Sequence, residues 1–446
     1  MDATATGREV SAMLLNVGPS HPAMHGVIRL ITELEGESVV KVEAEIGYLH
    51  RAFEKSCENS SWTQAIPYTD RLNYVSPLIN NFAYCAAIEK LLGLEITERC
   101  KYIRVVMSEI SRITDHLTCI AASAMELGAM TAFLYFMKAR EYLYEIVEEV
   151  TGARLTVSYG RIGGVKGDLP EGIHDRLETA LKKTEKEIAE VDKLLTRNRI
   201  WVDRTRDVGV LTKEAALRYS ITGPVARSAG INYDVRKAFP YFVYDRLEFI
   251  VPLGERGDNY DRYLVRMEEM RQSIRIIRQA MRDLPGGPIN VNAEGEVIES
   301  FDLVDRAKLG HTAGLTNVIA KLEPTLEGTE RPYHDRVMPD NRRVVLPSKE
   351  DTYGNIEGLM NHFKLIMDYH GIRPPKGDTY HAEEGANGEL GFYVVSDGQD
   401  RPYRVRVRPP CFFNMAGLHT MLEGYMVADI VATFGTINMI AGELDR

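Results

Sequence analysis

Residues 102–152 read YIRVVMSEISRITDHLTCIAASAMELGAMTAFLYFMKAREYLYEIVEEVTG. The pattern predicts a long helical stretch that breaks near Gly128 and is rich in aromatic side chains in its second half. Residues 117–137 are apolar or small apart from Glu126, and the length of this segment could span a bilayer. A lone carboxylate in the middle of such a span is costly, so we expect a buried central helix instead.

Shorter patterns on both sides of this stretch complete the predicted architecture. Long helices in the middle and strands at both ends predict an α+β, mainly helical fold: a central helical bundle with small β-sheets formed by the N- and C-terminal regions. The end of the chain reads as helical before a short extended tail. Further helices are expected at 175–198, 262–284 and 355–369, and strands at 13–17, 27–34, 39–46, 391–395 and 403–407, with a hairpin turn at 35–37.

The same patterns divide the chain into five parts. The fourth part begins Pro285-Gly286-Gly287-Pro288 and runs polar through further prolines. A segment of this length is a functional loop, a docking element or partly disordered. The parts are an N-terminal tail (1–12), an N-terminal α/β region (13–99), a central helical bundle (100–284), a long insertion or docking loop (285–350) and a C-terminal α/β region (351–446).

Composition excludes several classes of protein. The chain has 446 residues, 44% of them hydrophobic, and a net charge of −10. This size provides a sizeable core, and an acidic balance without a basic run argues against nucleic-acid binding. Five dispersed cysteines without a Cys-x-x-Cys pair argue against a zinc site or iron–sulfur cluster bound by this chain and favour a reducing compartment. The N-terminus lacks the apolar core of a signal peptide, so we expect a soluble intracellular protein.

The stretch Gly18-Pro19-Ser20-His21-Pro22-Ala23-Met24-His25-Gly26 presents two candidate functional histidines. Its prolines and glycines argue against a continuous helix, so His21 and His25 lie on a rigid turn just before a strand. The unperturbed pKa of histidine lies closest to neutrality, which favours proton handling or ligand binding. The alternative is that both imidazoles only hydrogen-bond the turn.

Three further side chains are candidates. Glu126 is expected to be buried, where a carboxylate has a raised pKa and is either paired or a proton carrier; alternatively it reaches solvent at the kink near Gly128. Tyr74 has a hydroxyl that can donate a hydrogen bond or a proton and a flat ring that can contact a flat ligand. Arg51 is expected to pair with a carboxylate as part of the fold.

Motifs of several enzyme classes are absent from the sequence. Residues 160–165 contain three glycines but lack the Gly-x-Gly-x-x-Gly spacing, and no Walker lysine is present. There is also no Gly-x-Ser-x-Gly elbow and no His-Glu-x-x-His helix. The chain is therefore not expected to bind NAD or ATP by these routes, or zinc on a helix of this kind.

Several blocks, in the same order along the chain, resemble one family: the quinone-site subunit (the D subunit) of proton-pumping NADH dehydrogenase, respiratory complex I. The resemblance extends from about residue 13 to the C-terminus and is interrupted mainly at 290–347. The blocks are Gly18–Gly26, Ile46–Arg51, Glu54-Lys55, Arg161–Val165, Gly230–Lys237, Pro252–Asp258, Val395–Gly398, Arg401–Arg404 and Gly442–Arg446.

That family is similar to the large subunit of nickel–iron hydrogenases, which implies a hydrogenase-like fold. The hydrogenase metal motif Cys-x-x-Cys falls on Asn73 and Ser76, with Tyr74 between them, and the second metal-binding pair falls near residues 437–442. The four thiolates of the metal centre are missing, so the resemblance implies an organic pocket in place of the metal and no metal bound by this chain.

The resemblance also implies roles for particular residues. His25 and Tyr74 are expected to bind the quinone head group and, with Glu126, to form the catalytic set. The family usually has an aspartate as the partner of this histidine, whereas this chain has Glu126, and Ala132 replaces a common proline just beyond it.

A multisubunit assembly is implied as well. A partner's iron–sulfur cluster is expected to supply electrons to the quinone, with coupled proton translocation. The expected partners are the cluster-bearing B subunit, the C subunit, the iron–sulfur I subunit and the membrane H subunit, on the cytoplasmic face of a bacterial inner membrane. The alternatives are a hydrogenase-type metalloenzyme, a non-catalytic scaffold, or a subunit of a ferredoxin-driven relative; the choice between ubiquinone and menaquinone stays open.

Overall fold

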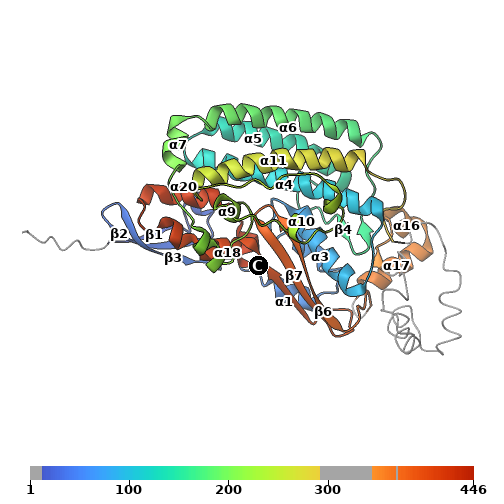
Figure 1. Ribbon diagram of the computed structural model, residues 1–446. Helices are drawn as coiled ribbons and strands as arrows, with labels where there is room; N and C mark the ends of the chain where they lie inside the picture. The colour runs from blue at the N-terminus through green and yellow to red at the C-terminus, as the bar shows by residue number, and fades with distance from the viewer. Residues whose placement is uncertain (1–12, 292–343, 368–369) are drawn as a thin grey trace, which may run out of the picture.

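Long helices form one side of the molecule and small sheets lie on the other (Figure 1). The computed structural model describes residues 13–291, 344–367 and 370–446. α4 is the centre of the bundle, because it contacts α5 and α11 extensively and also contacts α3 and α20. The bundle helices are α4 (Glu98–Glu126), α5 (Met130–Thr151), α6 (Ile173–Leu195) and α11 (Asn259–Arg282); α3 is Pro77–Leu92 and α20 is Val427–Ile437.

The predicted break near Gly128 is confirmed. α4 ends at Glu126 and α5 begins at Met130, and Gly128 between them has a φ of 87°, which favours glycine. α4 begins earlier than the predicted residue 102, because the hydroxyl oxygen of Thr97 caps it by accepting from the Cys100 amide. Within the described ranges, no helix is long and apolar enough to cross a membrane.

The N-terminal sheet contains the three predicted strands and the predicted turn. β1 (Met13–Val17), β2 (Arg29–Glu35) and β3 (Ser38–Glu45) are antiparallel neighbours. Glu35 pairs directly with Ser38, so residues 36 and 37 form the hairpin turn.

The C-terminal sheet contains a strand that the sequence did not predict. β6 (Gly377–Gly385) pairs with β7 (Gly388–Ser396), which pairs with β8 (Arg404–Arg408). β6 carries consecutive buried glutamates, Glu383 and Glu384, so it lacks the alternation of apolar and polar residues that marks a strand.

The chain does not end in an extended tail. After α20, Asn438 adopts a left-handed conformation and the chain forms a last helix, α21 (Ala441–Asp445), which is buried. The prediction of an extended tail was therefore wrong. The remaining elements are η1 (Pro22–Met24), α1 (Phe53–Asn59), α2 (Ile66–Thr69), β4 (Gly160–Arg161), β5 (Gly164–Val165), α7 (Arg199–Thr205), α8 (Lys213–Arg218), α9 (Gly223–Ser228), α10 (Val235–Ala238), η2 (Tyr244–Arg246), α16 (Lys349–Gly354), α17 (Ile356–Ile366), α18 (Pro410–Ala416) and α19 (Leu418–Leu422).

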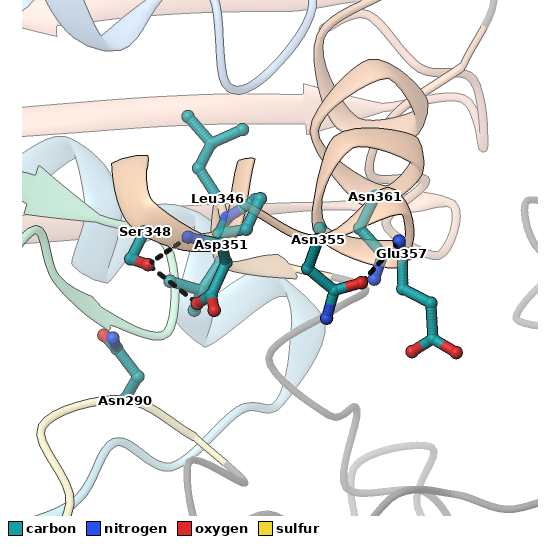
Figure 2. A pocket seen from close by; sticks show the side chains of 10 residues that line it. Asn290, Leu346, Ser348, Asp351, Asn355, Glu357 and Asn361 are labelled. Carbon is teal, nitrogen blue, oxygen red and sulfur yellow. Dashed lines mark hydrogen bonds between the residues drawn. The ribbon is translucent and has the colours of Figure 1, made fainter. Parts of the chain in front are cut away.

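Most of the predicted insertion at 285–350 lies outside the described residues, which exclude 292–343. Its described ends are tied to the body of the protein: Asn290 accepts a hydrogen bond from the Val165 amide, and Val345 joins a hydrophobic cluster. A hollow of about 260 Å³ lies between Asn290 and the first turns of α16 and α17. Figure 2 shows the side chains that line it, among them Ser348 and Asn355, which cap the two helices.

Candidate functional site

The two histidines of the turn at residues 18–26 have different roles. His21 precedes η1, and its Nδ1 accepts a hydrogen bond from the Ala23 amide at 3.2 Å, so it does hydrogen-bond the turn. His25 has a φ of 54° and turns its imidazole onto Phe434 of α20, with ring centroids 6.0 Å apart. The His25 side chain reaches solvent, yet partial desolvation lowers its pKa, so the neutral imidazole is favoured near pH 7.

Tyr74 lies on the surface of a mostly buried loop between α2 and α3. Its side chain is 37% exposed, whereas its neighbours Asn73 and Val75 are buried. Partial burial raises the pKa of Tyr74, and the nearby Cys411 acts in the same direction. The phenol therefore stays protonated and can donate a hydrogen bond at physiological pH.

His25 and Tyr74 border the same hydrophobic cluster. Their chain neighbours Met24 and Val75 belong to it, together with Phe434 of α20 and Ala441 of α21. The fold thus brings the histidine turn, the tyrosine loop and the C-terminal helices to one region of the molecule.

Asp115 hydrogen-bonds the buried polar side chains behind Tyr74, those of Asn73, Ser76 and Asn438, which we call the wall of the site. This carboxylate is fully buried on α4 and accepts from Asn73 Nδ2 at 2.8 Å, from Ser76 Oγ at 2.7 Å and from Asn438 Nδ2 at 2.7 Å. The loop at residues 73–76 and the segment that follows α20 therefore meet at one carboxylate. Sequence reasoning missed Asp115, although polar residues at 109, 112, 115 and 116 of a buried helix were the available signal.

A second buried carboxylate continues this wall. Glu443 accepts from Cys411 Sγ at 2.8 Å, and Asn387 bridges to Asn438 through a 2.6 Å hydrogen bond. Burial raises the pKa of Glu443 to about 7, and burial together with Glu443 raises that of the Cys411 thiol. The described residues contain no group of three or more His, Cys, Asp or Glu side chains arranged to hold a metal ion.

The end of α21 ties the C-terminus to the loop that precedes α1. Asp445 accepts from the amides of Gly47 at 2.9 Å and Leu49 at 2.8 Å. Arg51, which we expected to pair with a carboxylate, instead donates to the backbone carbonyl of Arg71. No carboxylate of the described residues forms an ion pair with it, so that prediction was wrong. A Cβ at Gly442 would lie 2.5 Å from the same carbonyl, so only glycine permits this close approach.

Glu126 stands at the last position of α4. Burial raises its pKa to about 8, and its Oε2 has no hydrogen-bond partner among the described residues. A Cβ at Gly435 of α20 would lie 2.4 Å from this oxygen, so the glycine makes room for the carboxylate. No hydrogen bond or ion pair joins Glu126 to His25 within the described chain; the two side chains contact adjacent residues of α20.

A buried ion-pair network, which the sequence did not predict, holds the bundle to the C-terminal sheet. Glu109 pairs with Arg112 and Arg236, and Arg227 bridges Glu269 and Glu384. Burial opposes ionisation of Glu109, but the two arginines outweigh it and lower its pKa to about 2. The network also contains Asp234, at 2.6 Å from Arg236, and His116, at 2.8 Å from Glu269.

Comparison with known proteins identifies the class to which this fold and site belong. A sequence profile of the 49 kDa subunit of respiratory-chain NADH dehydrogenase matches residues 126–446. The chain therefore belongs to this family. The relationship to hydrogenases is not part of that match.

Similar proteins with names indicate which subunit this family corresponds to in bacteria. A protein of Myxococcus xanthus, named as the D subunit of NADH-quinone oxidoreductase, is 49% identical over 438 residues, 98% of this chain and 94% of that protein. The protein of the same name from Pelobacter propionicus is 48% identical over 97% of this chain and 95% of its own length. A Bdellovibrio bacteriovorus protein, named as the C/D subunit of the same oxidoreductase, is 46% identical over 97% of this chain and 68% of that protein.

Proposed function

We propose that this chain forms the quinone-reduction site of respiratory NADH:quinone oxidoreductase, with Tyr74 and His25 as the residues that hold the head group. The observation that carries the proposal is the arrangement at Tyr74: a protonated, half-exposed phenol stands on a buried wall whose polar groups are already paired at Asp115. The wall is fixed, so Tyr74 is the group left to donate to a ligand.

Reduction of a quinone takes up two electrons and two protons, and the charge that develops on its oxygens is costly in a water-poor pocket. Tyr74 Oη–H and a ring N–H of His25 donate hydrogen bonds to these oxygens. A neutral His25 binds as a donor and passes on a proton only after it has taken one up, because desolvation lowers its pKa.

Glu126 is proposed as the proton carrier of the set. Its pKa of about 8 keeps it largely protonated near pH 7 and able to release a proton when the local charge changes. A unit charge about 10 Å from the Glu126 carboxylate, at an effective dielectric constant near 20, changes the electrostatic energy of this carboxylate by roughly 1.7 kcal/mol. This suffices to bias a two-state element, through which quinone chemistry is coupled to proton translocation. Unchanged pumping and quinone turnover in a Glu126→Gln enzyme would contradict this role.

The remaining parts of the proposal concern the assembly. Electrons come from an iron–sulfur cluster of the B subunit, and the C, I and H subunits complete the surroundings, at the cytoplasmic face of a bacterial inner membrane. The relative whose name joins C and D supports proximity of the C subunit, because one chain there covers both. The alternative, a non-catalytic scaffold derived from a hydrogenase, predicts that neither Tyr74 nor His25 matters for turnover.

Replacing Tyr74 by phenylalanine tests the proposal, because this removes one hydroxyl and leaves the ring. NADH:quinone reductase activity in native membranes is expected to fall by about 10-fold or more, as for loss of a positioned donor, while NADH:ferricyanide activity, which reports assembly, persists. Tyr68→Phe is the matched control, since Tyr68 lies in the same segment and is 39% exposed. Unchanged quinone reduction in Tyr74→Phe would favour the scaffold.

A further inference from the structure

A small cavity lies between α4, α7, α11 and α20, apart from the residues at Tyr74. Its lining includes Ser123, Trp201, Arg262, Arg266 and Thr436. The cavity offers about 10 Å³ to the centre of a water-sized sphere. It therefore has room for one small molecule or ion. Arg262 and Arg266 are one helical turn apart on α11 and almost completely buried, at 0% and 1% exposure.

The lining residues carry hydrogen-bond donors that have no partner. Within the described residues these are Arg262 Nε, the Nε and Nη1 of Arg266, and the indole Nε1 of Trp201. Buried N–H groups are normally paired, and a guanidinium group has donors but no acceptor. These unpaired N–H groups belong to residues that line one cavity, so a ligand bound there is expected to accept hydrogen bonds.

The two arginines also have no close anionic partner among the described residues. No described carboxylate forms an ion pair with either one, in contrast to Arg227 and Arg236 of the buried network. The terminal nitrogens of Arg262 donate to neutral oxygens, among them the carbonyls of Gly209 and Gly257. Burial and the neighbouring Arg266 lower the pKa of Arg262 to about 9, and the attraction of the more distant Asp258 and Asp261 does not offset them.

The hydroxyl groups in the wall are already engaged. Ser123 Oγ donates to the Cys119 carbonyl, Thr436 Oγ1 donates to the Thr433 carbonyl, and the Tyr263 hydroxyl pairs with Thr196. A water molecule could donate to the lone pairs of these hydroxyl oxygens, but it would leave the two guanidinium groups without a negative charge beside them, whereas an anion accepts from the donors and also supplies that charge. We propose that Arg262, Arg266 and Trp201 form a buried binding site for one small monovalent anion of halide size, with chloride as its natural occupant.

Bromide is a direct probe, because it replaces chloride and scatters anomalously. Crystals of the whole complex grown in bromide are expected to show one anomalous peak between Arg266 and Trp201 of this subunit. A water-sized density without anomalous signal, or no density, would overturn the proposal. This measurement needs no variant, so a folding defect in a substituted chain does not affect it.

A stability measurement on the purified complex distinguishes specific binding from a general salt effect. Chloride is exchanged for gluconate, which is too large to enter, at constant ionic strength. The melting temperature of the assembly is expected to rise with chloride in the wild type and in Arg271→Met, an exposed arginine on the same helix. The rise is expected to vanish in Arg266→Met. An equal response in all three, or none in the wild type, would contradict the site.

Discussion

Glu126 occupies the last residue of α4, where the carboxylate has lost part of its solvent without gaining a hydrogen bond for Oε2 from the described residues. Its pKa of about 8 in the folded chain exceeds the value of an unfolded glutamate. The folded state therefore binds more protons than the unfolded state between these two values, and stability falls as the pH rises through this window.

We expect Glu126→Gln to remove this dependence. The free energy of unfolding of the wild type should fall by about 1–3 kcal/mol between about pH 5 and pH 9, a range reduced for the partial exposure of the side chain. The variant should be flat by comparison and more stable than the wild type at the alkaline end. Urea titrations of the full-length chain across this range provide the measurement.

The matched control for this substitution is Glu145→Gln, because Glu145 is an exposed glutamate on α5. It should leave the pH profile of the wild type unchanged. Parallel profiles for Glu126→Gln and the wild type would show that the carboxylate is solvated and titrates normally.

The sequence allowed us to select candidate site residues whose neighbours in the chain are unusual. It did not allow us to select polar residues that only the fold buries. His25 follows prolines and glycines, and Glu126 interrupts an apolar run, so both stand out. Asp115 looks like an ordinary polar residue of an amphipathic helix, and Glu443 like a residue of the predicted extended tail, until the fold places donors around them. The prediction for Arg51 was wrong for a related reason. A guanidinium group can also donate to backbone carbonyls, and the pattern of side chains in a sequence does not reveal such partners.

At the scale of elements, the buried ion pairs explain why polar residues occur inside the bundle. Arg112 donates to Glu109 on its own helix and to the carbonyls of Glu384 and Gly385 at the end of β6. Arg236 of α10 reaches the same Glu109. Glu109 thus joins α4 to α10, and through Arg112 it is linked to the C-terminal sheet.

Glu109→Gln should destabilise the chain by about 3–5 kcal/mol, because it leaves Arg112 buried without a carboxylate. The pKa of Glu109, about 2, lies below that of an unfolded glutamate, so its contribution is complete above about pH 5 and is lost as the pH falls. Urea unfolding at neutral pH measures the loss. Glu141→Gln, which breaks a surface pair with Arg154, should cost no more than about 1 kcal/mol; equal costs would contradict the role of burial.

Elements with regular periodicity were predicted to within a few residues. α6 and α11 carry apolar side chains at helical spacing, and the N-terminal hairpin has both a glycine turn and apolar alternation. β6 was missed because Glu383 and Glu384 are buried against arginines and a hydrogen-bonded tyrosine, so tertiary contacts replace the pattern that local sequence would show. α21 was missed because it is a single short helix closed by contacts with distant loops.

At the scale of the whole molecule, the C-terminal residues connect regions that lie far apart in the sequence. Asp445→Ala should release the amides of Gly47 and Leu49 from their shared side-chain acceptor and cost about 1–3 kcal/mol. Hydrogen exchange at these two amides should accelerate, whereas Asp397→Ala, at an exposed turn, should leave them unchanged. Unaltered exchange in Asp445→Ala would mean that the loop is held by other contacts.

The hydrogen bond between Asp115 and Asn438 spans 323 residues of chain. At about 5–20 residues per second, a ribosome needs roughly 15–65 seconds to make the amide after the carboxylate. During that interval Asp115 lacks its partner from the C-terminal region, and the nascent bundle has no C-terminal helix to cover it. The site therefore matures only after nearly the whole chain has been translated, so premature termination late in the message yields a bundle without a finished pocket rather than a shortened working subunit.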